Sequence, residues 1–208
     1  EVRLAAIVAL RRQRDPAVTV YLNDADPLVV AEAASAIHDD ESIPEALPAL
    51  ARLLGSSAEL HERTARRSLS AALRLRKPEF ASLVADYALV ESTPAPLRLH
   101  ALRLLNDWLE PANLDTVEGR YRPLPAVSPE TIAPVLEVAL AALSKSPDAV
   151  IAEEAWIAMA TMGLEPVEAD LREILNHDIP LSAAALEQLA SLQVDDLQDL
   201  GEAALKSH

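Results

Sequence analysis

The chain has 208 residues, half of them apolar and only 3% aromatic, and it carries a formal net charge of −15. A chain of this length buries a core without metal or disulfide staples. The absence of cysteine excludes disulfides, thiolate catalysis, cysteine-ligated metal and covalently attached c-type haem within it, and the acidic balance argues against a nucleic-acid surface, which needs clustered Lys and Arg.

One phrase recurs along the chain: a turn residue or proline, then an apolar residue, then small residues at helical spacing. It begins at residues 2–10 and returns at 26–37, 60–69, 96–105, 147–159 and 180–189. Each copy predicts a helix with a small anchor residue where it crosses its neighbours, because a small side chain lets two helix backbones approach closely. These anchors are Ala6, Ala33, Ala65, Ala101, Ala155 and Ala185.

Between the anchor helices, further amphipathic segments predict partner helices. Residues 43–54 have apolar residues three and four apart and end at Gly55, and Ser128-Pro129 starts a helix that continues through 132–143. Segments 80–90, 167–175 and 197–205 repeat this role. The sequence therefore predicts about eleven helices with short connections, and it shows no convincing strand pattern.

The spacing of the anchors predicts how the helices are organised. Four of the five separations lie between 27 and 36 residues, near the period of a two-helix repeat. We therefore expect an all-α fold, an α-solenoid of the HEAT-like or armadillo-type superhelix class, with about six two-helix units in one repeat domain over 1–208. The fifth separation, 54 residues, predicts a loop insertion at 110–127. The first helix has no cap before it, which indicates an excerpt of a longer multidomain protein.

The predicted helix at 60–77 is the most basic one. Its cations would suit an alternative function, a HEAT-like nucleic-acid-binding or DNA glycosylase-type module whose basic face tracks phosphates. Glu59 and Glu62 share this helix and no other helix continues the stripe, so a solvated or salt-bridged face is favoured and nucleic acid is the disfavoured partner. The cations are Arg63, Arg66, Arg67, Arg74, Arg76 and Lys77.

The stretch around the insertion is the least ordinary part of the sequence. It holds one of the two tryptophans and one of the three tyrosines. Because long connections in compact arrays are often functional, Trp108, Arg120, Tyr121 and Arg122 are the candidate interaction residues. The alternative is that Trp108 and Tyr121 pin the loop to the helices, and a combined arrangement would bury Trp108 and expose the two arginines.

Three phrases, at 2–12, 22–34 and 107–125, carry a family resemblance. They resemble the HEAT-repeat segment of large secreted proteins from planctomycete-type bacteria, where it follows a quinoprotein sugar-dehydrogenase-like propeller and precedes a cytochrome c domain. The resemblance implies an exported or periplasmic parent protein with redox chemistry, and a spacer and docking role for this segment. None of that family's redox residues maps onto this chain, since haem attachment requires cysteine.

Catalytic and metal-binding motifs are missing from the sequence. The five histidines include no pair at i, i+3 or i, i+4 spacing, and the acids beside His38 and His177 fall at predicted helix ends, where polar groups act as caps. We therefore predict no catalytic residue, no metal and no cofactor, and a non-catalytic scaffold for protein–protein or domain–domain interaction. All of the net negative charge arises from residues 78–208, so a partner of that half should be basic or neutral. The sequence leaves a small-molecule ligand open.

Overall fold

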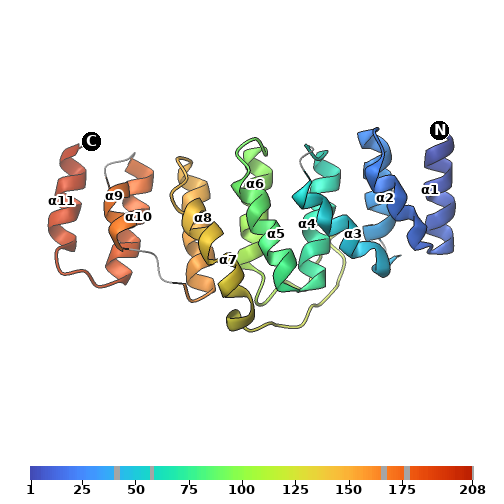
Figure 1. Cartoon of the computed structure of the whole chain (residues 1–208). Coiled ribbons are helices and arrows are strands. Elements are labelled where there is room, and N and C mark those ends of the chain that lie inside the picture. Colours follow the sequence, from blue (N-terminus) through green and yellow to red (C-terminus); the bar gives the residue numbers. More distant parts are fainter. Residues whose placement is uncertain (40–42, 57–58, 165–167, 176–178, 208) are drawn as a thin grey trace.

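The computed structural model describes residues 1–39, 43–56, 59–164, 168–175 and 179–207. Within these ranges the chain is all-helical, as predicted, with eleven α-helices, short 3-10 segments and no strand (Figure 1). The 3-10 segments include η1 (Pro16–Asn23), η3 (Pro44–Ala46) and η4 (Arg52–Gly55). The α-helices are α1 (Val2–Gln13), α2 (Pro27–His38), α3 (Leu47–Ala51), α4 (Glu62–Leu75), α5 (Pro78–Leu89), α6 (Ala95–Asn106), α7 (Pro129–Leu143), α8 (Ala149–Thr161), α9 (Glu168–Ile174), α10 (Ile179–Ser191) and α11 (Leu197–Ser207).

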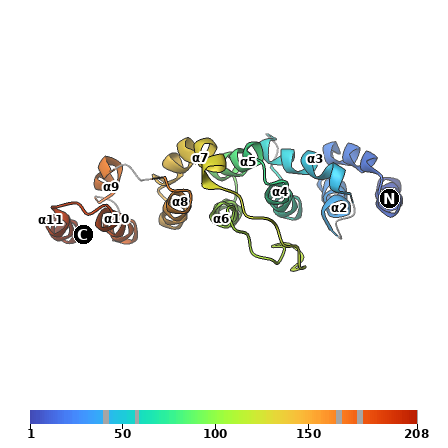
Figure 2. The ribbon, with the colours of Figure 1, turned by 90° about the horizontal axis from the view of Figure 1, so that it is seen from below.

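The helices stand in two rows, and the two ends of the chain lie at opposite ends of the molecule (Figures 1 and 2). In the first row α1, α2, α4, α6, α8 and α10 each pack against the next, and α11 packs against α10. In the second row η1, α3, α5, α7 and α9 each pack against a helix of the first row. Most contacts therefore join elements that are close in the sequence.

Proline and aspartate fix the starts of several helices. A proline occupies the first turn of α2, α5 and α7, where its missing N–H has no partner to lose. Asp26 caps α2 by accepting a hydrogen bond from the backbone N–H of Leu28 at 3.0 Å, and Asp148 caps α8 by accepting from that of Val150 at 3.1 Å. Local sequence thus decides where these helices begin.

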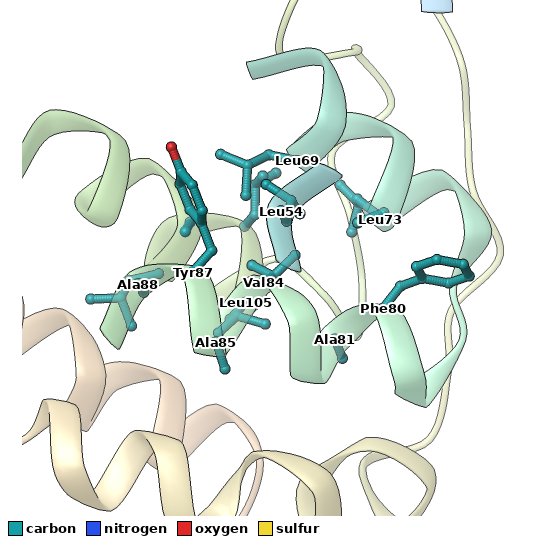
Figure 3. Packing of buried hydrophobic residues seen from close by; sticks show 14 of the residues in the cluster. Leu54, Leu69, Leu73, Phe80, Ala81, Val84, Ala85, Tyr87, Ala88 and Leu105 are labelled. Carbon is teal, nitrogen blue, oxygen red and sulfur yellow. The ribbon is translucent and has the colours of Figure 1, made fainter. Parts of the chain in front are cut away.

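One hydrophobic cluster extends through both rows, from Ile7 to Leu189. In its middle, Leu69 of α4, Val84 of α5 and Leu105 of α6 lie close together (Figure 3). The expectation that the anchor alanines lie where helices pack is confirmed for five of the six, which are fully buried, whereas Ala6 on α1 is half-buried. The buried five are Ala33, Ala65, Ala101, Ala155 and Ala185.

Two segments differ from the predicted helices. Residues 16–23, for which the sequence pattern predicts no element, form the 3-10 segment η1 and bury Val18 and Leu22. The predicted continuous helix at 43–54 is instead divided into η3, α3 and η4. Pro48 gives the physical reason for the break between η3 and α3, because it has no N–H to donate to the carbonyl of Pro44, four residues earlier.

Between α6 and α7 the chain leaves the helices over residues 107–128, called the insertion from here on; it contains the predicted 110–127. The insertion runs past the ends at which α4 and α6 finish and projects beside the first row (Figures 1 and 2). No helix in the described ranges is long and apolar enough to cross a membrane.

Candidate functional site

The two ends of the insertion are held together by one arginine. Arg76 directly follows α4, in a left-handed backbone conformation with φ of 56°. Its Nη2 donates hydrogen bonds to the carbonyls of Leu109 at 3.2 Å and Pro125 at 2.9 Å, and the backbone N–H of Val127 also donates to Leu109 at 3.0 Å. Burial lowers the pKa of the Arg76 guanidinium. These bonds close the insertion into a loop with a narrow base.

The tip of the insertion is a small hairpin. Leu114 and Tyr121 form an isolated antiparallel bridge. Asp115 shapes the turn, because its Oδ1 accepts from the backbone N–H groups two and three residues further on, at 2.9 Å each. Gly119 completes the turn with φ of 66°, a left-handed conformation that glycine adopts without steric cost. The turn therefore has a defined conformation of its own.

The other carboxylate oxygen of Asp115 faces the helices. Asp115 Oδ2 accepts from Ser70 Oγ at 2.8 Å and from Arg74 Nη2 at 2.9 Å, and it lies 3.6 Å from His38 Nε2. The Asp115 side chain is only 3% exposed, although it belongs to a loop. A buried carboxylate is tolerated only when it is paired and hydrogen-bonded, and these partners meet that need. Asp115 thus joins the insertion to α2 and α4.

His38, the last residue of α2, is fully buried between carboxylates. Its Nδ1 lies 3.0 Å from Asp39 Oδ1 and its Nε2 lies 2.8 Å from Ser70 Oγ. Ser70 has one proton and donates it to Asp115, so the hydrogen bond between His38 and Ser70 is donated by Nε2. Nδ1 donates to Asp39, because a carboxylate only accepts.

Three arginines balance the carboxylates of this cluster. Arg67 makes two hydrogen bonds to Asp39 at 3.0 Å each. Burial tends to raise the pKa of Asp39, but hydrogen bonds from His38 and Arg67 and their charges lower it to about 2. Arg74 and Arg122 supply the other two guanidiniums. We call the whole group the insertion network: His38, Asp39, Arg67, Ser70, Arg74, Asp115, Glu118 and Arg122.

The side chains of Asp39, His38 and Ser70 form a hydrogen-bonded series with the same order of residue types as the Asp–His–Ser triad of a hydrolase. In such a triad the imidazole accepts the proton of a serine that can reach substrate. Here Ser70 is 2% exposed and its proton goes to Asp115, so His38 does not activate it. The hydrogen bonds of this arrangement hold the insertion against α2 and α4.

A metal-like grouping also appears in this network. His38, Asp115 and Glu118 each offer one ligand atom, and these atoms lie within 4.8 Å of one another. Two guanidiniums already hold these acids: Arg74 lies 2.9 Å from Asp115, and Arg122 lies 2.9 Å from Glu118 and 3.8 Å from Asp115. Fixed positive charges at these distances oppose a cation. The grouping is better explained as an ion-pair cluster.

The structure separates the four candidate interaction residues. Trp108 is fully buried, as the combined arrangement expects, and the Arg120 side chain is 55% exposed. Tyr121 is 72% exposed, so the alternative in which it pins the loop is wrong. The expectation that Arg122 is exposed is also wrong, because its side chain is only 7% exposed and pairs with Glu118. Arg120 and Tyr121 remain at the surface together.

The four arginines of the predicted basic helix that lie within α4 are all paired with acids, whereas Arg76 bonds to backbone carbonyls. Each guanidinium lies within 3.2 Å of a carboxylate oxygen, so the expected salt-bridged face is confirmed. The pairs are Arg63–Glu32, Arg66–Glu62, Arg67–Asp39 and Arg74–Asp115. This pairing leaves little uncompensated positive charge for a phosphate backbone. Lys77 lies beyond the end of α4.

Sequence reasoning placed His38 at a helix end but did not connect it to Ser70 or Asp115. No local signal could have done so, since positions 38, 70 and 115 belong to three separate segments. Asp40, Glu41 and the residues 176–178 around His177, predicted as caps, lie outside the described residues.

A cavity of about 480 Å³ lies beside the insertion network. The returning limb of the insertion, 121–124, forms one wall, and the corner between α2 and α3 forms the other. Arg74 and Arg122 line it as well.

Comparison of the chain with known protein families, curated proteins and solved structures finds no match. The resemblance to secreted planctomycete-type proteins stays a prediction.

Proposed function

We propose that the chain is a non-catalytic α-solenoid of the HEAT-like type that serves as a scaffold for protein–protein or domain–domain contact, with the insertion as its docking element. The helix packing supports the solenoid class: each helix of the first row packs against the next, and five of the six anchor alanines are fully buried. Units of this kind bury their apolar faces only by stacking on one another.

The observation that carries the docking role is the exposed tip of the insertion. Tyr121 is 72% exposed, Leu114 is 57% exposed and the Arg120 side chain is 55% exposed, and these residues lie on the two limbs of the hairpin. Tyrosine and arginine are the residue types that most often carry binding energy at protein interfaces. A chain with three tyrosines in 208 residues places one of them almost wholly in solvent at this tip.

The buried base of the insertion makes this tip suitable for docking. The insertion network and the Arg76 clamp hold the loop from beneath, while Tyr121 and Arg120 face outward. A surface that is ordered before binding loses less conformational entropy when a partner arrives. The charged groups of the network are used in this support, and Ser70 donates its proton to Asp115, which fits a non-catalytic role.

The test places a photo-crosslinking amino acid, p-benzoylphenylalanine, at Tyr121 in the protein produced in its native cells. The matched control carries the same amino acid at Leu205, which is 82% exposed on α11, far from the insertion. A defined crosslinked protein or domain is expected from position 121 and not from 205. Adding Leu114→Ser should reduce that product. Equal labelling from both positions, or none from 121, would contradict the docking role.

Deletion of residues 112–122 is a poorer test. Since the loop lies outside the helices, the sequence alone suggests that such a deletion leaves helicity intact. The deletion also removes Asp115, Glu118 and Arg122, and this leaves Arg74 and His38 buried without their carboxylate. Surface substitutions at the tip separate docking from folding more cleanly.

The exported redox parent protein stays a proposal based on the resemblance alone. The coding sequence on either side of this segment tests it: a Cys-x-x-Cys-His motif downstream and a bladed propeller upstream would support it. The nucleic-acid alternative has lost support through the pairing of its arginines, and salt-sensitive duplex binding at low ionic strength would restore it.

A further inference from the structure

The cavity between the insertion and the α2–α3 corner has walls from three separate segments. Ile37 lines the cavity from α2, Leu47 lines it from α3, and Pro123 and Leu124 line it from the insertion. Tyr121 stands at the same cavity and is largely exposed. The volume of the cavity, about 480 Å³, falls within the range of pockets that hold small organic ligands.

The charged groups that line this cavity all have one sign. Among the described residues they are Arg74 and Arg122, and no carboxylate lines the cavity. Asp115, the acidic partner of Arg74, lines a neighbouring cavity of about 30 Å³ together with both arginines, and its side chain is 3% exposed. Among the described residues that line it, the cavity thus has two cations and no anion, in a chain whose net charge is −15.

Both guanidiniums are held in place before any ligand arrives. The side chains of Arg74 and Arg122 are only 9% and 7% exposed. Arg74 donates from Nη1 to the carbonyl of His38 and from Nη2 to Asp115, while its buried Nε has no hydrogen-bond partner in the described part of the chain. A guanidinium has five N–H donors, so Arg74 can donate a hydrogen bond to a further anion without giving up these bonds. Partial burial strengthens its attraction for an anion.

We propose that this cavity binds a small organic carboxylate with an apolar or aromatic body. The carboxylate lies against Arg74 and Arg122, since planar guanidinium and carboxylate groups match each other in geometry. The apolar body packs against Ile37, Leu47 and Leu124, and Tyr121 covers its outer side. This site does not depend on the docking role of the insertion tip.

Phenylacetate is the probe, and 2-phenylethanol, which has the same ring without the charge, is its matched control. Each is titrated into the ¹⁵N-labelled full chain, and backbone amide shifts of Tyr121, Arg122 and Leu124 are followed by NMR. Phenylacetate is expected to give saturable shifts at these amides and 2-phenylethanol none of comparable size. Absence of saturable shifts with phenylacetate overturns the proposal.

Two variants at one position separate charge from shape. Leu47→Glu places a carboxylate on the cavity wall away from the insertion network, and Leu47→Gln places a neutral group of the same size there. The dissociation constant of phenylacetate should rise at least about tenfold in Leu47→Glu and much less in Leu47→Gln. Equal weakening in both variants overturns the assignment of an anion site. Saturable binding of an acidic hexapeptide without binding of phenylacetate also overturns it and indicates a protein partner.

Discussion

Ser70 joins three segments of the chain through a single hydroxyl group. It donates to Asp115 of the insertion and accepts from His38 of α2, while it belongs to α4 itself. Because the group is buried, each of its partners loses a hydrogen bond when the hydroxyl is removed. Its importance lies in these partners rather than in any reactivity of the hydroxyl.

Ser70→Ala should therefore lower the free energy of unfolding by about 1–3 kcal/mol, because it leaves buried donors and acceptors unsatisfied. Ser191→Ala is the matched control, since the Ser191 hydroxyl is exposed and donates to the carbonyl of Gln188 in its own helix. That change should stay within about 0.5 kcal/mol. Urea unfolding measures both. A Ser70→Ala protein as stable as the parent chain would contradict the role of the network.

Asp39 makes the network sensitive to acid. Its pKa is about 2 in the folded protein, below its ordinary value of 3.8, because hydrogen bonds from His38 and Arg67 outweigh the opposing effect of burial. Its stabilising contribution is thus fully present above about pH 4 and is lost as the pH falls toward about 2. For this half-buried group the contribution is about 1–2 kcal/mol.

We expect the stability gap between the parent chain and Asp39→Asn to narrow over that acidic range. Chemical denaturation at a series of pH values between about 2 and 6 measures the gap. The result that does not fit is a constant gap across the series.

For single residues, the sequence predicts the burial of some side chains and not of others. Burial of Trp108 is predictable, because a large aromatic ring in a loop normally packs onto the core. Burial of Arg122 is not, because its partner Glu118 lies in a turn whose shape depends on Asp115 and Gly119 together. The cavity beside Arg74 is equally hidden, since its walls come from α2, α3 and the insertion.

Two helices end in the same way but for different purposes. Arg14 after α1 and Arg76 after α4 both adopt the left-handed backbone, with φ of 54° and 56°. That conformation costs a non-glycine residue energy, and helices commonly place glycine there. Arg14 follows α1, whereas Arg76 follows α4 and donates hydrogen bonds to both ends of the insertion. The strained backbone at Arg76 is therefore offset by the clamp.

Glycine substitution at the two positions should have opposite effects. Arg14→Gly relieves strain and should stabilise the fold by up to about 1 kcal/mol. Arg76→Gly relieves the same strain but removes the clamp, so the insertion should open and trypsin should cleave after the exposed Arg120 several times faster. Limited proteolysis followed by mass spectrometry measures this, and circular dichroism should show unchanged helicity. Equal cleavage rates in both variants would show that Arg76 does not clamp the loop.

The elements themselves divide into two classes by predictability. Helices that start with Pro or Asp and carry an anchor alanine follow directly from local sequence, as α2 and α8 do. The 3-10 segment η1 also starts with an aspartate cap and a proline, Asp15 and Pro16, but it lacks an anchor alanine, and it buries Val18 and Leu22 while packing against α1, α2 and α3. The break between η3 and α3 could have been predicted from Pro48.

Over the whole molecule, packing between neighbours should make the middle more protected than the ends. Helices α5 and α6 pack against elements on both sides, whereas α11 packs against α10 at one end of the array and is mostly exposed. Local opening is easiest where few buried contacts must be broken.

Hydrogen–deuterium exchange should therefore be slowest in α5 and α6 and fastest in α11, with intermediate rates in α8 and α10. Mass spectrometry of peptic fragments resolves these segments. Uniform protection along the chain would show that the array unfolds in one cooperative step instead.

The contact between the insertion and α2 has a mechanical consequence. Elsewhere in the described part of the molecule, the elements pack mainly against their neighbours. Asp115, however, reaches from beyond α6 back to His38 at the end of α2, across α4. Under tension applied to its two ends, the row should extend first on either side of this strap, while α2, α4 and α6 move together as one stiff block.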